Sequence, residues 1–210
     1  MLEQLLHPLI LIVTASIDHF GNYAVTALMA LESANIPIPS EAILTYAGYL
    51  ASKGLLNWHL AAFAGAVGCI IGGSVSYYIG LKLGRPFLMK YGKWFLLSPK
   101  DIEFAEKFLS KYGEATYFIS RLLPVIRTFI AFVVGISRGN FWRFNLYSFI
   151  GSWIWSYILV YIGLKLGDNW DTVKPFWDKF SAAIILIIII SIVWHIKRVF
   201  SQPKIKPFEN

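Results

Sequence analysis

Four ionisable residues interrupt two otherwise apolar tracts of the chain, and their types suit anion binding and proton transfer. Arg121 and Arg127 lie six residues apart in FISRLLPVIRT, with Pro124 between them. Glu32 and Glu41 lie nine residues apart in an earlier tract. Charged groups inside a membrane are costly and usually functional. If the two tracts lie within a bilayer, these four residues are therefore the candidate site.

The arginines are candidate phosphate binders. A planar guanidinium donates hydrogen bonds in a fork that matches phosphate oxygens, so Arg121 and Arg127 can hold the phosphate of a lipid headgroup. Burial favours the protonated form of a carboxyl group, so Glu32 and Glu41 can load and release protons and couple transport to the proton gradient. The alternative is structural, because two acids facing two bases neutralise each other and lower the cost of insertion. The residues alone leave both interpretations open.

The composition indicates a single-domain integral membrane protein with an all-α fold. Of the 210 residues, 57% are hydrophobic and 15% are charged, and the mean hydropathy is +0.59. Globular domains carry about 25% charged residues, so this chain lacks the charge to cover a water-facing surface. The net charge of +7 comes without a basic stripe, so we expect no nucleic-acid partner. No Lys or Arg precedes the short N-terminal apolar run, so we expect no cleaved signal.

Residues that usually bind metals or catalyse hydrolysis are sparse. Cys69 is the only cysteine, and the four histidines are dispersed without helical pairing. A phosphatase acting on lipid phosphates would need a histidine beside its arginines, and none is near Arg121 or Arg127 in the sequence. We therefore expect no metal, no cofactor and no enzyme activity.

Two uncharged segments are long enough to cross a bilayer. Leu60–Leu81 has 22 residues and Phe144–Leu164 has 21, and each would span roughly 30 Å as a helix. A third segment, Phe180–Ile196, is expected to form a C-terminal transmembrane helix. The first segment also carries glycines near one-turn spacing, which favours close helix packing; they are Gly65, Gly68, Gly72, Gly73 and Gly80.

The tracts that hold the charges, Tyr23–Ser52 and Ala115–Ser137, have uncharged arms of only 10 or 11 residues, which are too short to cross a bilayer. Proline removes a backbone donor and disfavours helix in the residue before it. We therefore expect hairpin bends at Pro37, Pro39 and Pro124. These tracts predict two re-entrant helical hairpins, and two ordinary kinked spans are the alternative.

An internal repeat favours the hairpins. The heptapeptide YIGLKLG occurs at Tyr78–Gly84 and, 83 positions later, at Tyr161–Gly167. The chain is therefore predicted to hold two copies of one unit, a hairpin followed by a spanning helix. Each unit crosses once, so the copies are inverted. The expected segments of this single membrane domain are a short N-terminal helix (1–18), the first repeat (19–84), a basic cytoplasmic linker (85–112), the second repeat (113–167) and the C-terminal transmembrane helix (180–199). Whether residues 1–18 span the membrane or lie on its surface stays open.

These residues resemble the DedA family, the bacterial relatives of the SNARE-associated or VTT-domain proteins. The resemblance covers about residues 20–165. It rests on Glu32 followed by IPIPSE with Glu41, Gly68-x-x-x-Gly72, Tyr77-x-x-Gly80-x-x-x-Gly84, Phe118-x-x-Arg121-x-x-Pro124-x-x-Arg127, and then Gly135, Phe141, Asn145 and Gly151-x-Trp153. The chain departs from the family pattern at Gly73, where the family often has an acid, and at Val134, where a small residue is usual.

The resemblance implies a lipid translocase that is driven by, or sensitive to, the proton gradient. Arg121 and Arg127 would bind the substrate phosphate, and Glu32 and Glu41 would be the protonatable pair. Undecaprenyl phosphate is the implied substrate. The implied location is the bacterial inner (cytoplasmic) membrane, as a multi-pass protein. The positive-inside rule then places the basic loops in the cytoplasm. The alternatives are a phosphatidylethanolamine or phospholipid flippase or scramblase, a proton-coupled antiporter for small cations, and a structural role. The expected partners are the lipid substrate, protons and membrane lipids, and a homo-oligomer remains open.

Overall fold

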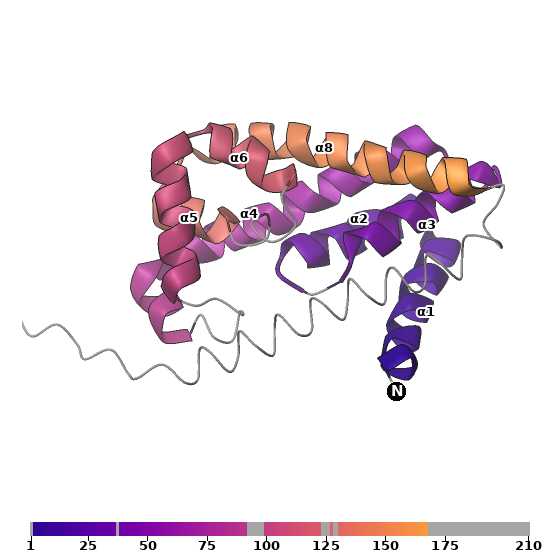
Figure 1. The fold of residues 1–210 in the computed structure, drawn as a ribbon, viewed down its shortest axis with the longest axis horizontal. Helices are drawn as coiled ribbons and strands as arrows, with labels where there is room; N and C mark the ends of the chain where they lie inside the picture. Colours follow the sequence, from indigo (N-terminus) through magenta and orange to yellow (C-terminus); the bar gives the residue numbers. More distant parts are fainter. Residues whose placement is uncertain (1, 37, 92–98, 123–126, 128–129, 168–210) are drawn as a thin grey trace, which may run out of the picture.

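The computed structural model describes residues 2–36, 38–91, 99–122, 127 and 130–167, and this part of the chain contains helices and turns but no strand (Figure 1). The helices are α1 (Leu2–Phe20), α2 (Asn22–Ser33), α3 (Ser40–Ser52), α4 (Trp58–Tyr91), α5 (Pro99–Tyr112), α6 (Ala115–Ile119), the 3₁₀ turn η2 (Ser120–Leu122), α7 (Ile130–Ile136) and α8 (Phe141–Leu166). The predicted all-α class is confirmed for these residues. The predicted C-terminal helix at 180–199 lies outside them.

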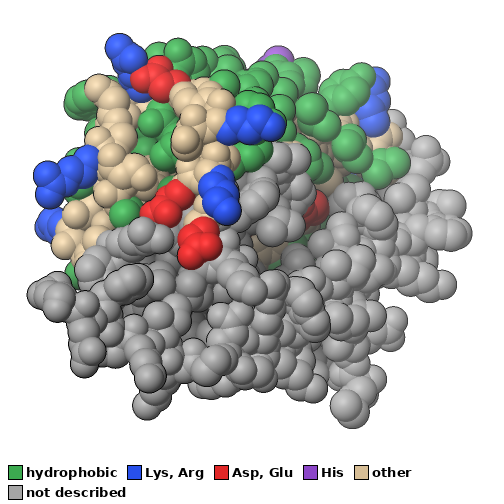
Figure 2. All heavy atoms as spheres, turned by 60° about the vertical axis from the view of Figure 1, so that its left-hand side comes forward, with side chains coloured by type: hydrophobic (Ala, Val, Ile, Leu, Met, Phe, Trp, Pro, Cys, Tyr) green, Lys and Arg blue, Asp and Glu red, His purple; other side chains and the backbone are tan. Residues whose placement is uncertain are grey.

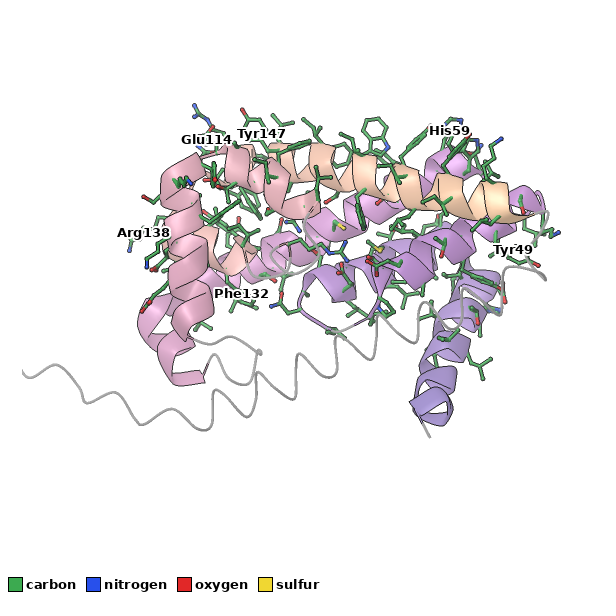
Figure 3. All side chains as sticks on the ribbon, viewed as in Figure 1. Tyr49, His59, Glu114, Phe132, Arg138 and Tyr147 are labelled. Atoms are coloured by element: carbon green, nitrogen blue, oxygen red, sulfur yellow. The ribbon has the colours of Figure 1, made fainter. Side chains whose placement is uncertain are left out.

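The long helices α4 and α8 pack against each other in opposite directions. The Tyr77 ring in the second half of α4 lies 5.2 Å from the Phe141 ring at the start of α8, whereas His59 at the start of α4 contacts Tyr157 in the second half of α8. Figure 3 accordingly shows His59 and Tyr147 near opposite ends of the pair. The shorter helices α2, α3 and α7 pack against these two long helices.

Two segments, 58–84 of α4 and 141–166 of α8, are long and apolar enough to cross a membrane. They contain the two spans predicted from the sequence. Both helices also expose large apolar side chains, which suits contact with lipid; examples are Leu60, Phe63, Ile71, Val75, Leu146, Ile150 and Ile158.

An asparagine begins each long helix. The side-chain oxygen of Asn57 accepts hydrogen bonds from the backbone N–H groups of His59 (3.0 Å) and Leu60 (3.1 Å). The side-chain oxygen of Asn140 accepts one from the backbone N–H of Arg143 (3.0 Å). These bonds satisfy donors that have no partner within the first helical turn. Asn57 and Asn140 are 83 positions apart, which is the offset of the repeated heptapeptide.

The first predicted hairpin region contains α2 and α3, and the described residues between them, 34–36 and 38–39, are not helical. Helix α2 ends in a Schellman motif, because Asn35 adopts a left-handed φ of 72° and the N–H of Ile36 donates to the carbonyl of Leu31 at 3.0 Å. Pro39 has an extended backbone immediately before the first residue of α3, and Pro37 lies outside the described residues. The turn brings the last turn of α2 next to the first turn of α3.

The second predicted hairpin region is less regular. Helix α6 runs directly into η2, so helical backbone continues through Arg121. Between η2 and α7 the structure describes only Arg127, and Pro124 lies outside the described residues. Helix α7 is almost wholly buried and packs mainly against α4.

The close contacts of α3 with α8 and of α7 with α4 depend on four glycines. A Cβ atom on any of them would collide with a backbone carbonyl oxygen of the neighbouring helix, so no larger residue fits without moving the helices apart. The collisions are between Gly48 of α3 and Val160 of α8, Gly163 of α8 and Thr45 of α3, Gly135 of α7 and Tyr77 of α4, and Gly80 of α4 and Phe132 of α7. The α3–α8 contact therefore matches the α7–α4 contact, with an offset of 83 positions in the long helices and 87 in the short ones.

Charged side chains gather at the end of the molecule where α5 lies, whereas hydrophobic side chains cover much of the neighbouring upper surface (Figure 2). The exposed charged residues of this end include Glu103, Lys107, Lys111, Arg138 and Arg143. Arg143 at the start of α8 forms an exposed ion pair of 2.7 Å with Glu114, which precedes α6. This end holds part of the predicted basic linker at 85–112.

Replacing Gly48 by Val should destabilise the bundle, because the new side chain would collide with the backbone of α8 at Val160. Overpacking of this kind costs about 1–3 kcal/mol. Thermal unfolding in detergent micelles measures the loss. Ala27→Val on the exposed face of α2 is the matched control and should change stability by less than about 0.5 kcal/mol. Equal stability of the two variants would contradict the close α3–α8 contact.

Candidate functional site

The four ionisable residues singled out in the sequence lie around the turn between α2 and α3. Glu32 is in the last turn of α2, Glu41 is in the first turn of α3, Arg121 is in η2, and Arg127 lies between η2 and α7. Glu32, Arg121 and Arg127 are only 6%, 3% and 7% exposed, whereas Glu41 is half-buried. The fold thus gathers three charged groups from distant parts of the chain into its interior.

Arg127 is held by Glu32 and Ser40. Its Nη2 atom forms an ion pair and hydrogen bond with Oε1 of Glu32, and it donates to the hydroxyl of Ser40 at 2.5 Å. Its guanidinium carbon lies 5.9 Å from the centroid of the Trp155 ring on α8, within the range of a cation–π interaction. A buried charge is strongly unfavourable without a counter-ion, so Glu32 is the group that allows Arg127 to be buried.

Arg121 differs from Arg127, because it has no carboxylate partner among the residues that the structure describes. Its Nη1 atom donates to the hydroxyl of Ser33 at 3.3 Å and to the backbone carbonyl of Arg127 at 3.4 Å. Its guanidinium carbon lies 5.5 Å from the centroid of the Phe144 ring. The hydrogen-bond acceptors of this buried cation in the described part of the chain are therefore neutral, and its electrostatic interaction with Glu32 is made without a direct ion pair.

Some N–H donors of the two guanidinium groups have no acceptor among the described residues. Nε and Nη2 of Arg121 and Nε of Arg127 are buried and have no hydrogen-bond partner among the described residues. A guanidinium N–H can only donate, so whatever completes these bonds must be an acceptor. Because the described centre holds two buried arginines and one buried acid, an anionic acceptor would also balance its charge.

Glu41 contributes to the charge of this centre without a direct ion pair in the described part. It interacts electrostatically with both Glu32 and Arg127. Of the three predicted bend residues, Pro39 precedes α3, beside Ser40 and Glu41, while Pro37 and Pro124 fall outside the described residues.

Two residues of this centre, Ser33 and Ser40, were not predicted from the sequence. Their buried hydroxyls accept hydrogen bonds from Arg121 and Arg127, respectively. Ser33 is the last residue of α2 and Ser40 is the first residue of α3. Their position on both sides of the proline-containing turn was the available signal.

Comparison with known proteins assigns the chain to a family. The model of the VTT domain matches residues 38–165, a region that includes Glu41, both arginines and the two long helices. The chain belongs to the VTT-domain (DedA) family of membrane proteins. It is 36% identical over 163 residues to undecaprenyl phosphate transporter A of Bacillus subtilis, which covers 77% of this chain and 82% of that protein.

Other relatives of this VTT-domain chain carry different names. An alkaline phosphatase-like protein of Lactococcus lactis subsp. lactis is 32% identical over 208 residues, covering 95% of this chain and 97% of that protein. Protein DedA of Escherichia coli is 31% identical over 159 residues, covering 74% and 70%. No solved structure matches the chain. The family resemblance seen in the sequence motifs is thus confirmed.

Replacing Glu32 by Gln should destabilise the protein, because it leaves Arg127 as a buried charge without its counter-ion. Breaking one side of a buried pair costs about 3–5 kcal/mol. The double variant Glu32→Gln with Arg127→Met removes both charges and should recover most of that loss. Glu41→Gln, at a half-buried position without a direct ion pair in the described part, should cost less than about 1 kcal/mol.

Thermal unfolding of the four proteins in the same detergent at one pH measures these differences. A double variant that is no more stable than Glu32→Gln would contradict the pairing of Glu32 with Arg127.

Proposed function

We propose that this protein moves a phosphate-bearing lipid, undecaprenyl phosphate, across the bacterial inner membrane, and that Arg121 and Arg127 hold the phosphate. One observation carries the proposal: two guanidinium groups are buried together, and part of their donors has no partner in the described structure. Phosphate oxygens are strong acceptors that match the guanidinium fork. A phosphate would therefore satisfy both the hydrogen bonds and the charge of the centre.

The start of α3 adds to the attraction for an anion. Ser40, which accepts a hydrogen bond from Arg127, is the first residue of this 13-residue helix. The N-terminus of a helix carries a partial positive charge and free backbone N–H groups. An anion between Arg127 and Ser40 would lie in this field.

The relatives support a lipid as the carrier of the phosphate. The Bacillus subtilis relative is named as an undecaprenyl phosphate transporter, and it aligns with 77% of this chain. The prenyl tail of such a lipid could pack against the exposed apolar side chains of α4 and α8 as it moves. A phospholipid headgroup offers the same phosphate chemistry, so phospholipid movement is the nearest alternative.

We further propose that the transport is coupled to protons through Glu32. The substrate phosphate and the Glu32 carboxylate would compete for the same guanidinium of Arg127. Protonation of Glu32 removes its negative charge and releases Arg127 to the phosphate, so the proton and the anion would enter the centre together. Arg121, Glu41 and the buried thiol of Cys69 also interact electrostatically with this group, and Glu41 is the second protonatable residue.

The architecture for this cycle would be an inverted repeat with two re-entrant hairpins, in a multi-pass protein. The matched glycine contacts of α3 with α8 and of α7 with α4 support it, as do the two asparagine caps 83 positions apart. Inverted repeats place the substrate site where the broken helices of the two units meet. Arg127 and Glu32, which form an ion pair, come from the two different units.

We propose transport rather than hydrolysis, even though some relatives are named as alkaline phosphatase-like. Hydrolysis of a phosphate ester needs a nucleophile or a general acid–base group beside the arginines. The two histidines whose side chains are described, His19 and His59, are exposed, and His59 contacts Tyr157 at the far end of α8 from the charged end.

Undecaprenyl phosphate movement in proteoliposomes tests the proposal. Phosphorus NMR with an impermeant paramagnetic ion outside the vesicles separates the two leaflets, and a pH gradient is applied or omitted. Arg121→Ala and Arg127→Ala should each slow transport at least tenfold, because each removes charge-assisted hydrogen bonds to the phosphate. Glu32→Gln should transport at a rate that no longer responds to the gradient, because the neutral amide imitates the protonated acid.

The exposed Arg143, which pairs with Glu114, provides the matched control, and Arg143→Ala should transport normally. Full lipid movement in both Arg121→Ala and Arg127→Ala would rule out the phosphate site. Proton-coupled exchange of small cations that survives in those two variants would favour the antiporter instead.

A further inference from the structure

Gly73 of α4 packs against the guanidinium of Arg121. A Cβ atom built on Gly73 of α4 would lie only 2.7 Å from Nη2 of Arg121, the nitrogen that has no partner among the described residues. The next atoms near that position are the guanidinium carbon of Arg121 at 3.7 Å and the hydroxyl oxygen of Ser33 at 3.8 Å. A side chain at position 73 of α4 would therefore contact this guanidinium directly.

The other side of Arg121 faces α8. Phe144 lies under the guanidinium, and Gly151, two turns further along α8, contacts the Cβ and Cγ region of the same arginine. Ser148 is one turn after Phe144 and three residues before Gly151, so it lies on the face of α8 that Arg121 covers. Its hydroxyl is fully buried and has no hydrogen-bond partner among the described residues.

Ser152 follows on the same face. It is 3% exposed, and its hydroxyl interacts with the thiol of Cys69, a weak hydrogen-bond partner, but makes no other hydrogen bond in the described part. Cys69 in turn lies within electrostatic reach of Arg121. The unused donors Arg121 Nε, Arg121 Nη2 and the two serine hydroxyls therefore come from neighbouring positions of η2 and α8.

We infer that Arg121 is the group that first receives the anionic oxygens of the substrate, and that Gly73, Ser148 and Ser152 form the rest of this subsite. This rests on the proposed function and assigns unequal roles to the two arginines. Arg127 is occupied by Glu32 and Ser40, whereas Arg121 offers two nitrogen atoms that are free within the described structure. The ligand class is a phosphate monoester, whose three terminal oxygens can accept from the guanidinium and from both hydroxyls.

Gly73 sets the charge of this subsite by having no side chain. A carboxylate at position 73 would meet Arg121 directly and form a second buried ion pair like that of Glu32 with Arg127. Both guanidinium groups would then have an internal counter-ion, and a phosphate would have to displace one of them. A glycine keeps the positive charge of Arg121 available.

Calorimetric titration of the full chain in detergent micelles tests the subsite. The probe is geranyl phosphate, with geraniol and inorganic phosphate as separate arms that report the prenyl chain and the phosphate alone. The wild-type protein should bind geranyl phosphate, should bind inorganic phosphate more weakly, and should show no specific heat with geraniol. Gly73→Asp should weaken geranyl phosphate binding at least tenfold, whereas Gly73→Asn, which has the same shape without the charge, should weaken it less than threefold.

The serines are tested separately, so that the outcome does not depend on how the variants at position 73 fold. Ser148→Ala and Ser152→Ala should each weaken binding about tenfold, the usual effect of losing a hydrogen bond to a charged group. Ser156→Ala is the matched control, because Ser156 is equally buried on α8 but lies against Gly65 and Leu44, and it should bind normally.

Three results test this inference and the function on which it rests. If Arg121→Ala abolishes binding but Gly73→Asp, Ser148→Ala and Ser152→Ala all bind normally, the subsite is wrong and phosphate binding stands. If Gly73→Asn binds geranyl phosphate as weakly as Gly73→Asp does, the electrostatic role of Gly73 is wrong. If the wild-type protein binds neither geranyl phosphate nor inorganic phosphate, both the subsite and the proposed function fail.

Discussion

The ion pair between Arg127 and Glu32 is the interaction on which the centre of this protein depends. It joins the end of α2 to the segment before α7, and both side chains are more than nine-tenths buried. A pair of this kind is stable only if the surrounding backbone holds the two groups in contact and excludes alternatives. The Schellman motif that ends α2 and the extended Pro39 before α3 fix the turn that carries Glu32, Ser33 and Ser40.

The close packing of the helices also helps to hold the buried charged groups in place. The glycines of α3, α4, α7 and α8 let the short helices lie directly against the backbones of the long ones. Within this frame the two arginines have unequal surroundings, because Arg127 has a carboxylate partner and Arg121 has neutral acceptors only in the described part. In the proposed transport, Arg121 therefore binds the anion directly, whereas the protonation of Glu32 controls whether Arg127 can bind it.

The sequence predicted the features that depend on composition and on residue type. Uncharged runs identified the two long helices, because crossing a bilayer requires about 20 apolar residues. Charges inside apolar tracts identified Glu32, Arg121 and Arg127, because such charges are too costly to be incidental. The family motifs identified the VTT-domain (DedA) family, which the comparisons confirm.

The sequence did not predict which charged side chains pair with each other, or which uncharged residues lie beside them. Glu32 and Glu41 look alike in the sequence, and only the three-dimensional fold distinguishes the buried partner of Arg127 from the half-buried acid nearby. Ser33, Ser40 and Ser148 are ordinary residues until the arginines are placed beside them, and the sequence marked Gly73 only as a packing glycine and a departure from the family pattern. The caps at Asn57 and Asn140 carry the repeat offset but share too little flanking sequence to be noticed.

The contact between phosphate and guanidinium tests the central claim most directly. Solid-state NMR in lipid bilayers can measure the dipolar coupling between phosphorus of bound undecaprenyl phosphate and ¹⁵N-labelled arginine side chains. We predict a coupling that corresponds to about 4 Å, the separation of a hydrogen-bonded pair, and a weaker coupling when Arg121 is replaced by Lys, because only Arg127 then contributes labelled nitrogen at the phosphate. A coupling that is absent in the wild-type protein, or unchanged in Arg121→Lys, would contradict a phosphate site at Arg121.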